Sequence, residues 1–288
     1  MKHIYRQRLV RRWNMYKADP LSMGLFLAVT LAAVITVGIL LLIIGYILAK
    51  GVPNLSFGLF AWTYSSSNVS LMPALINTVT MTLLSLAIAG PLGIFSAVYL
   101  VEYAQRSSRL VKVIQVTAET LSGIPSIVYG LFGLLFFVTT IGWGYSILAG
   151  AFTLAIMILP LIMRTTEEAL QSVPDAYRQG SFALGAGRLR TVFRIVLPAA
   201  VPGILAGIIL AIGRIVGETA ALIYTAGTVP AIPTTLMGSG RTLSVHMYAL
   251  SSEGLYTSQA YATAVVLLVV VVGINWLSGF VARKLVKG

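Results

Sequence analysis

Long stretches without a charged side chain are the feature that most limits what this chain can fold into. Residues 21–49 form an uncharged run of 29, residues 69–101 one of 33, and residues 113–163 contain a single charge, Glu119, in 51 positions. About 20 apolar residues in a helix cross the hydrocarbon core of a bilayer. The alternating strands of a lipid-facing barrel are not evident in the sequence. We therefore predict an all-α integral membrane protein.

Composition narrows the class of function. The 288 residues are 58% hydrophobic and 10% charged, and their mean hydropathy is +0.91, so no separate soluble domain is expected. The sequence contains no Cys and two His, which argues against disulfides, thiol catalysis and metal clusters. No Lys follows a Gly, which excludes a phosphate-binding loop of the GxxxxGK[ST] kind. We therefore expect no cofactor, and no nucleotide bound through such a loop.

Six transmembrane helices are predicted from the apolar runs. Residues 113–163 are long enough for two of them, which a Gly- and Thr-rich turn at residues 139–146 separates. The runs that contain the six helices are residues 21–49, 69–101, 113–163, 203–227 and 254–282. The expected organisation is a basic N-terminus (1–20), a transmembrane domain (21–282) and a short tail (283–288). The first run is too long for the apolar region of a signal peptide.

The positive charges predict the topology. With six spans, 17 Lys and Arg fall on one side of the membrane and 2 on the other, with Arg214 left inside a span. Because Lys and Arg collect on the cytoplasmic side, both termini, residues 102–112 and residues 164–202 are expected there. The net charge of +12 is thus a topology signal and predicts no nucleic-acid partner. The expected location is the inner (cytoplasmic) membrane.

Arg214 and Glu218 are the most unusual pair inside the predicted spans. An unpaired Arg near the middle of a bilayer costs at least about 2.5–3.5 kcal/mol on insertion scales. Glu218 follows at i+4, which would place it on the same helix face. One interpretation is a self-neutralising pair that helps the helix to insert. The favoured one is that Arg214 lines a polar path and binds an anion, because a guanidinium suits tetrahedral oxyanions.

Glu119 is the other acidic residue inside a predicted span. A kink is expected just after it, near residues 121–125, because Gly123 loosens the helix and Pro125 removes a backbone donor. Two interpretations remain open, an interfacial carboxylate and a role opposite Arg214.

The polar segment 164–202 interrupts the apolar sequence. It predicts a helix that ends before Pro174, a short second helix, a Gly-rich turn at residues 185–187 and an amphipathic piece. Arg188, Arg190 and Arg194 give that piece a basic face. Composition alone allows an amphipathic helix on the membrane surface.

The spacing within this segment resembles a signature of the permease subunits of ABC importers. That signature reads EAA, three residues, Gly, nine residues, then Ile-x-Leu-Pro. Here Gly185 is followed after nine residues by Ile195, Leu197 and Pro198, whereas QGS occupies the EAA position. The residues in that position are Gln179, Gly180 and Ser181. The resemblance implies a coupling helix that docks on an ATPase subunit, and Gln in place of Glu leaves a charged contact there open.

Further pieces resemble the permease of the phosphate-specific importer, PstA type. They include LSGIPSIVYGLFG (121–133) and GRIVGETAALIYTAG (213–227). The RxxGET segment resembles the one in which that family places its translocation residues. The substrate residues implied are Arg214, Glu218 and Thr219, with Glu119 as a further candidate. The implied fold is the six-helix core of methionine- and molybdate-type importers, in which one chain supplies half a pore.

The resemblance also implies partners. They are a homologous PstC-like permease, a PstB-like ATPase dimer that hydrolyses ATP, a PstS-like extracytoplasmic phosphate-binding protein, phosphate and membrane lipid. The chain itself is then a transport subunit without enzymatic activity. The alternatives are another oxyanion such as phosphonate or sulfate, and an ATPase-independent transporter. A membrane enzyme is disfavoured because the eight acidic residues are scattered.

Overall fold

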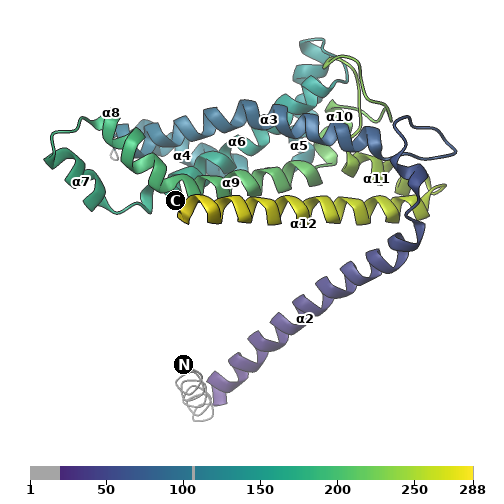
Figure 1. Cartoon of the computed structure of the whole chain (residues 1–288), viewed down its shortest axis with the longest axis horizontal. Coiled ribbons are helices and arrows are strands. Elements are labelled where there is room, and N and C mark those ends of the chain that lie inside the picture. Colours follow the sequence, from purple (N-terminus) through teal and green to yellow (C-terminus); the bar gives the residue numbers. More distant parts are fainter. Residues whose placement is uncertain (1–19, 106–107, 288) are drawn as a thin grey trace. The chain divides into compact units, whose positions relative to one another are not determined.

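The computed structural model describes residues 20–105 and 108–287, with the backbone alone at residues 20, 278 and 281–287. Helices are the regular elements of these residues (Figure 1). Contacts between Cα atoms divide the chain into residues 1–50 and residues 51–288. Most of the predicted N-terminus (1–20) lies outside the described residues, as does Gly288 of the predicted tail.

The first unit consists of one long helix in its described part. Helix α2 (Pro20–Gly51) begins one residue before the predicted first run and ends two residues after it. The candidate span Leu21–Asn54 has a hydropathy of 3.0, and none of its most apolar window is buried inside the structure. A helix that is apolar on every side is typical of a membrane span. Length and composition therefore agree with the predicted first span.

The second unit is a bundle built around four long helices. They are α3 (Met72–Val98), α6 (Ile147–Gln171), α9 (Leu197–Gly217) and α12 (Thr257–Lys287). Helix α6 packs against α3 and α9, and α9 packs against α12; Figure 1 shows α3, α9 and α12 running alongside one another. Met81, Leu154 and Ile215 are fully buried in the core between α3, α6 and α9.

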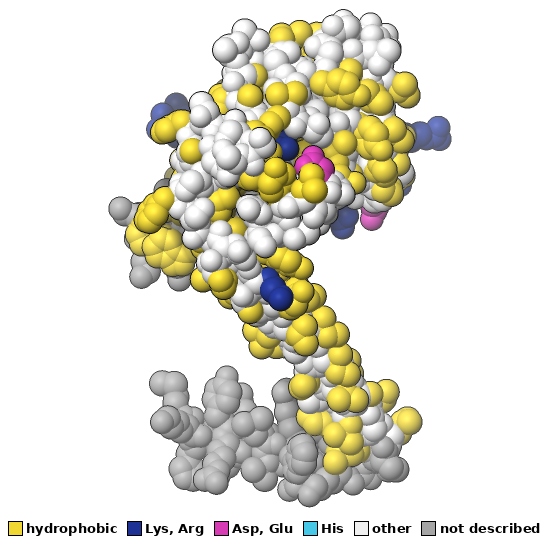
Figure 2. Space-filling view, turned by 90° about the vertical axis from the view of Figure 1, so that its right-hand side faces the viewer, with side chains coloured by type: hydrophobic (Ala, Val, Ile, Leu, Met, Phe, Trp, Pro, Cys, Tyr) yellow, Lys and Arg dark blue, Asp and Glu magenta, His cyan; other side chains and the backbone are white. Residues whose placement is uncertain are grey.

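Shorter elements connect these helices. They are α4 (Arg109–Ser122), α5 (Ser126–Gly133), α7 (Asp175–Ala183), α8 (Arg188–Thr191), α10 (Ala220–Thr225) and α11 (Leu243–Glu253). Three π-helical turns extend longer helices, at Tyr99–Tyr103 after α3, Leu134–Thr140 after α5 and Val192–Val196 before α9. Charged side chains are sparse on the face drawn in Figure 2, as a membrane protein requires.

The expected kink near residues 121–125 is present and is sharp. Helix α4 and the helix that starts with α5 meet at 101°, across a break at Gly123–Pro125. Pro125 has no backbone N–H to continue the helix and adopts an extended ψ of 140°. Among the described residues, five helices are long and apolar enough to cross a membrane, or six if the bent pair counts as one span. The prediction of six spans therefore depends on this bent pair.

The bounds predicted for the fifth span, residues 203–227, are wrong. A continuous helical stretch runs from Arg188 to Gly217 through α8, a π-helical turn and α9. The predicted amphipathic piece is thus the first part of the same long helix. The π-helical turn Val192–Val196 lies directly before Pro198, within this continuous stretch. At the other end, the helix stops ten residues short of the predicted limit at 227.

Helices α5 and α10 pack closely at Gly130, which gives a first prediction. A Cβ atom on Gly130 of α5 would lie 2.8 Å from the Cα of Ala221 in α10, too close for a backbone contact. We expect Gly130→Ala to lower the free energy of unfolding by about 1–3 kcal/mol. Gly90→Ala in α3 is the control, because a Cβ there meets nothing within 4 Å. The melting temperatures of the two variants in detergent check this, and equal values would contradict it.

Candidate functional site

The RxxGET segment lies where α9 ends and α10 begins. Arg214 is in the last turn of α9, and Glu218 is the first residue after the helix, with ψ of 129°. In the described residues no ion pair joins Glu218 to Arg214, so the expected i,i+4 pair is not formed. Glu218 lies at the end of the helix, where its carboxylate has a different partner.

Glu218 holds the short helix that follows. Its side chain is 8% exposed, and its Oε1 accepts a hydrogen bond from the backbone N–H of Ala221 at 3.1 Å. A carboxylate in this position satisfies a free donor and stabilises the helix N-terminus. The Glu218 carbonyl also accepts a hydrogen bond from the hydroxyl of Ser244 in α11. Glu218 thus joins the break to both neighbouring helices.

Arg214 has no acidic partner among the residues that the structure describes. It is half-buried and interacts electrostatically with Tyr129 of α5. The Tyr129 hydroxyl in turn donates to the carbonyl of Leu121, in the last turn of α4, at 2.8 Å. The cation therefore lies beside the sharp bend. A guanidinium that is not neutralised by a carboxylate can donate to an anion.

The other two predicted substrate residues differ in position. Thr219 lies next to Glu218, half-buried, and its hydroxyl makes a long contact of 3.4 Å with the carbonyl of Gly217. Glu119 lies in α4, is 72% exposed and forms an ion pair of 3.8 Å with Arg164 of α6. In the described part of the chain, no hydrogen bond or ion pair joins Glu119 to Arg214. The partner of Glu119 in this structure is therefore Arg164 and not Arg214.

The predicted coupling residues form a helix, a turn and a second helix. Gln179 and Gly180 are exposed on α7, whereas the Ser181 hydroxyl is buried against that of Thr191, 2.8 Å away. Gly185 ends this unit with φ of +79°, a conformation that favours glycine. The remaining residues of the signature, Ile195, Leu197 and Pro198, lie at the junction of the π-helical turn and α9.

The surface beside α7 combines apolar and basic side chains. Tyr177 and Leu184 are 53% and 90% exposed. A groove of about 510 Å³ separates Ser181 and Leu184 from Arg190 and Arg194 of the following helix. Exposed apolar side chains rimmed by charges are typical of a surface that binds another protein.

Arg241 and His246 form a buried cluster that the sequence reasoning missed. Arg241 is 4% exposed, and its guanidinium lies 4.9 Å from the centre of the Tyr64 ring. His246 of α11 is fully buried with its ring edge-on to Tyr64. Burial, together with the nearby charge of Arg241, lowers the pKa of His246 to about 3. The sequence feature that could have indicated this cluster is Arg241 itself, the single Lys or Arg in the loop 228–258.

The buried His246 predicts a pH dependence of stability. Its pKa is 6.5 when free and about 3 in the fold, so below pH 6.5 the unfolded chain binds the proton more readily. We expect acidification from pH 6.5 to 5 to cost about 2 kcal/mol at this residue. Melting temperatures of the wild type in detergent should therefore fall more steeply over this range than those of His246→Gln. Equal slopes would contradict the prediction, whatever the baseline stability of the variant.

Comparisons with known proteins agree with this architecture. Residues 89–287 match the family described as "Binding-protein-dependent transport system inner membrane component". The chain is 36% identical to the "Probable ABC transporter permease protein YqgI" of Bacillus subtilis (strain 168), over 93% of this chain and 97% of that protein. It is 34% identical to the "Phosphate transport system permease protein PstA" of Mycobacterium leprae (strain TN), over 74% of this chain and 73% of that protein.

The fold is also found in solved structures. The inward-facing MetNI methionine ABC transporter matches 75% of this chain and 94% of its own, with a TM-score of 0.60 and 21% identity. The predicted permease fold, the multi-span membrane location and the role as a transport subunit are thus confirmed. Membership of this family further implies an ATPase and a substrate-binding protein as partners. The chain belongs to the family of binding-protein-dependent ABC importer permeases.

Proposed function

We propose that this chain is the PstA-type permease subunit of an ATP-driven importer of inorganic phosphate. The observation that carries the proposal is Arg214, a half-buried guanidinium at a helix break without an acidic partner among the described residues. A guanidinium stays charged at any working pH and presents parallel donors to a tetrahedral oxyanion. The similarity to a Mycobacterium leprae protein named as a phosphate permease supports phosphate as that anion.

The proposed complex contains four kinds of chain. A PstC-like permease completes the pore, a PstB-like ATPase dimer binds the segment 164–202, and a PstS-like protein delivers phosphate from outside. The exposed apolar and basic surface beside α7 supports ATPase docking. The 17-to-2 distribution of Lys and Arg supports cytoplasmic termini in the inner membrane.

Alternating access is the proposed mechanism. Closure of the ATPase subunits moves α7, the attached helices tilt, and the site near Arg214 changes the side that it faces. Arg214 lies in the last turn of α9, directly before the break that precedes α10, and its charge acts on Tyr129, whose hydroxyl donates to Leu121 at the 101° bend. A single Arg binds phosphate weakly enough to release it, as transport requires.

Arg214 is the residue whose replacement tests the substrate site. In a strain that relies on this transporter, we expect Arg214→Gln to lower uptake of labelled phosphate at least about ten-fold, since a charge-assisted contact is lost. Arg214→Lys should retain part of the activity, because it keeps the charge without the planar fork. The control is Arg109→Gln, which removes an exposed Arg at the start of α4.

Wild-type uptake in both Arg214 variants would refute the site. Competition of labelled-phosphate uptake by unlabelled phosphate, phosphonate and sulfate tests the cargo separately. Stronger competition by phosphonate or sulfate than by phosphate would move the proposal to another oxyanion. Uptake by the purified chain alone, without ATPase, would instead indicate an independent transporter.

Glu218 should act through the helix break rather than through its charge. We expect Glu218→Gln to retain most of the uptake, because an amide oxygen can still accept from the N–H of Ala221. Glu218→Ala loses the cap, at about 1 kcal/mol, and should lower both uptake and melting temperature. Equal loss of uptake in the two variants at unchanged melting temperature would instead show that the negative charge tunes Arg214.

A further inference from the structure

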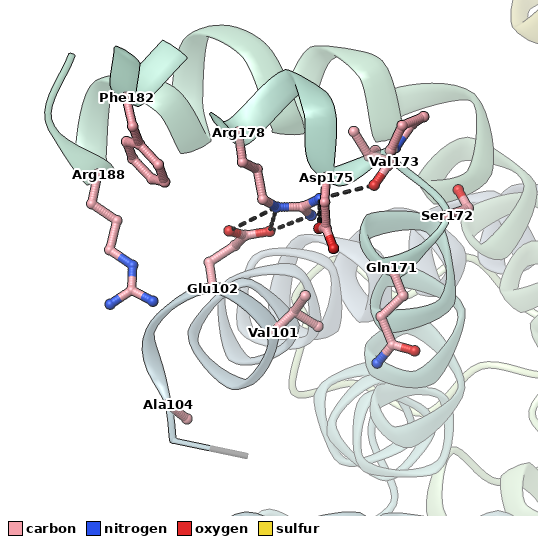
Figure 3. A pocket seen from close by; sticks show the side chains of 11 residues that line it. Val101, Glu102, Ala104, Gln171, Ser172, Val173, Asp175, Arg178, Phe182 and Arg188 are labelled. Carbon is pink, nitrogen blue, oxygen red and sulfur yellow. Dashed lines mark hydrogen bonds and ion pairs between the residues drawn. The ribbon is translucent and has the colours of Figure 1, made fainter. Parts of the chain in front are cut away.

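Arg178 of the coupling helix α7 makes a buried ion pair with Glu102. Its Nη2 lies 2.7 Å from Glu102 Oε1, and its Nε lies 3.1 Å from the same oxygen. The two side chains are 15% and 7% exposed. Glu102 belongs to the π-helical turn Tyr99–Tyr103 that ends α3. Figure 3 shows the carboxylate and the guanidinium facing each other between the two helices.

The same guanidinium also binds the end of α6. Its Nη2 donates to the carbonyl of Leu170 at 2.9 Å, and its Nη1 donates to the carbonyl of Val173 at 2.8 Å. These carbonyls lie at the C-terminus of α6, where a cation is favoured by the helix dipole. A weaker, exposed contact of 3.1 Å joins Nη1 to Asp175. One side chain therefore joins α7 to the ends of α3 and α6.

Helix α7 has few other attachments to these helices. Its main packing contacts are with α8 and the π-helical turn that follow it in the chain. The apolar core beneath it includes Leu100, Leu170 and Val196, and in the described residues none of its members comes from α7. A cavity of about 700 Å³ lies around the ion pair, lined on the α7 side by Arg178 and Phe182. Polar contacts rather than apolar packing hold α7 against α3 and α6.

We propose that Arg178 and Glu102 are positioning residues that transmit movement of α7 to α3 and α6. The inference rests on the proposed docking of an ATPase on α7. A buried pair in which two guanidinium nitrogens donate to one carboxylate resists relative movement of its two helices, because separating them leaves two charges without partners. Displacement of α7 by an ATPase is then passed to α3 and α6 at their cytoplasmic ends. Without this contact, α7 remains joined to α6 through the linker 172–174, and its main packing contacts are with the elements that follow it.

Three substitutions test the inference in the complete reconstituted transporter. Glu102→Gln removes the negative charge of the pair, and Arg178→Lys removes the planar fork of the guanidinium. Asp175→Asn is the control, because the Asp175 side chain is 78% exposed and an exposed ion pair contributes little. We expect the first two to lower the stimulation of ATP hydrolysis by the binding protein roughly ten-fold, in keeping with the large effect of breaking a buried pair. Co-purification of the ATPase should remain at the wild-type level in all three.

A cross-link separates transmission from folding. The native chain has no Cys, so Glu102→Cys with Arg178→Cys can be joined by a bis-methanethiosulfonate whose spacer replaces the two side chains. Each thiolate displaces a sulfinate and forms a disulfide with the spacer, which a thiol reductant cleaves. We expect at least half of the stimulation to return after cross-linking and to be lost on reduction. Each single Cys variant, treated in the same way, should show no recovery.

Two results would overturn the inference. One is wild-type stimulation in Glu102→Gln and Arg178→Lys. The other is loss of the ATPase from the complex in proportion to the loss of stimulation, with no recovery on cross-linking, which would assign the pair to docking or folding. The readout is ATP hydrolysis and not phosphate uptake. A wild-type complex that carries another anion would therefore contradict the proposed substrate and leave this test valid.

Discussion

In a bilayer, every backbone N–H and C=O must be bonded within the protein, and the rest of this structure depends on that constraint. Long helices satisfy it without help, whereas each place where a helix ends or bends needs a local partner. Glu218 supplies an acceptor to Ala221 where α9 gives way to α10. In the predicted cytoplasmic segment, Arg178 donates in the same way to the carbonyl of Leu170 in the last turn of α6 and to that of Val173 just after it. In both places a polar side chain supplies the partner that the helix end lacks.

The sequence predicted the helical class and the location of most spans, because uncharged length alone decides them. It also located the turn of the coupling segment, since Gly185 with φ of +79° adopts a backbone conformation that few other residues adopt. Hydropathy could not show that the helix starting at Arg188 runs through to Gly217. A span whose cytoplasmic end carries charged residues has the same sequence pattern as a separate solvated helix followed by a span. Hydropathy therefore does not distinguish the two.

The candidate site was less predictable for a related reason. An acidic residue four positions after an Arg can be a helix-face partner or a cap beyond the helix end, and only the backbone distinguishes them. Here the helix ends at Gly217, so Glu218 caps α10 and Arg214 is left without a carboxylate. Glu119 was open between two roles because its partner, Arg164, lies 45 positions away on another helix. Contacts between distant segments are set by packing, which the local pattern does not encode.

Three arginines show how position decides what the same side chain can do. Arg178 is bonded to a carboxylate and to carbonyls, so its donors are occupied and it can only join helices. Arg241 is 4% exposed and lies against the Tyr64 ring, so almost none of its side chain is accessible to an anion from solvent. Arg214 is half-buried and lacks a carboxylate within the described chain, so an anion can reach it without breaking an ion pair. Because Glu218 is engaged in capping, phosphate binding at Arg214 would not have to compete with it. A site of this kind can load and empty as the adjoining break and bend change shape, while the Arg178 contact stays intact.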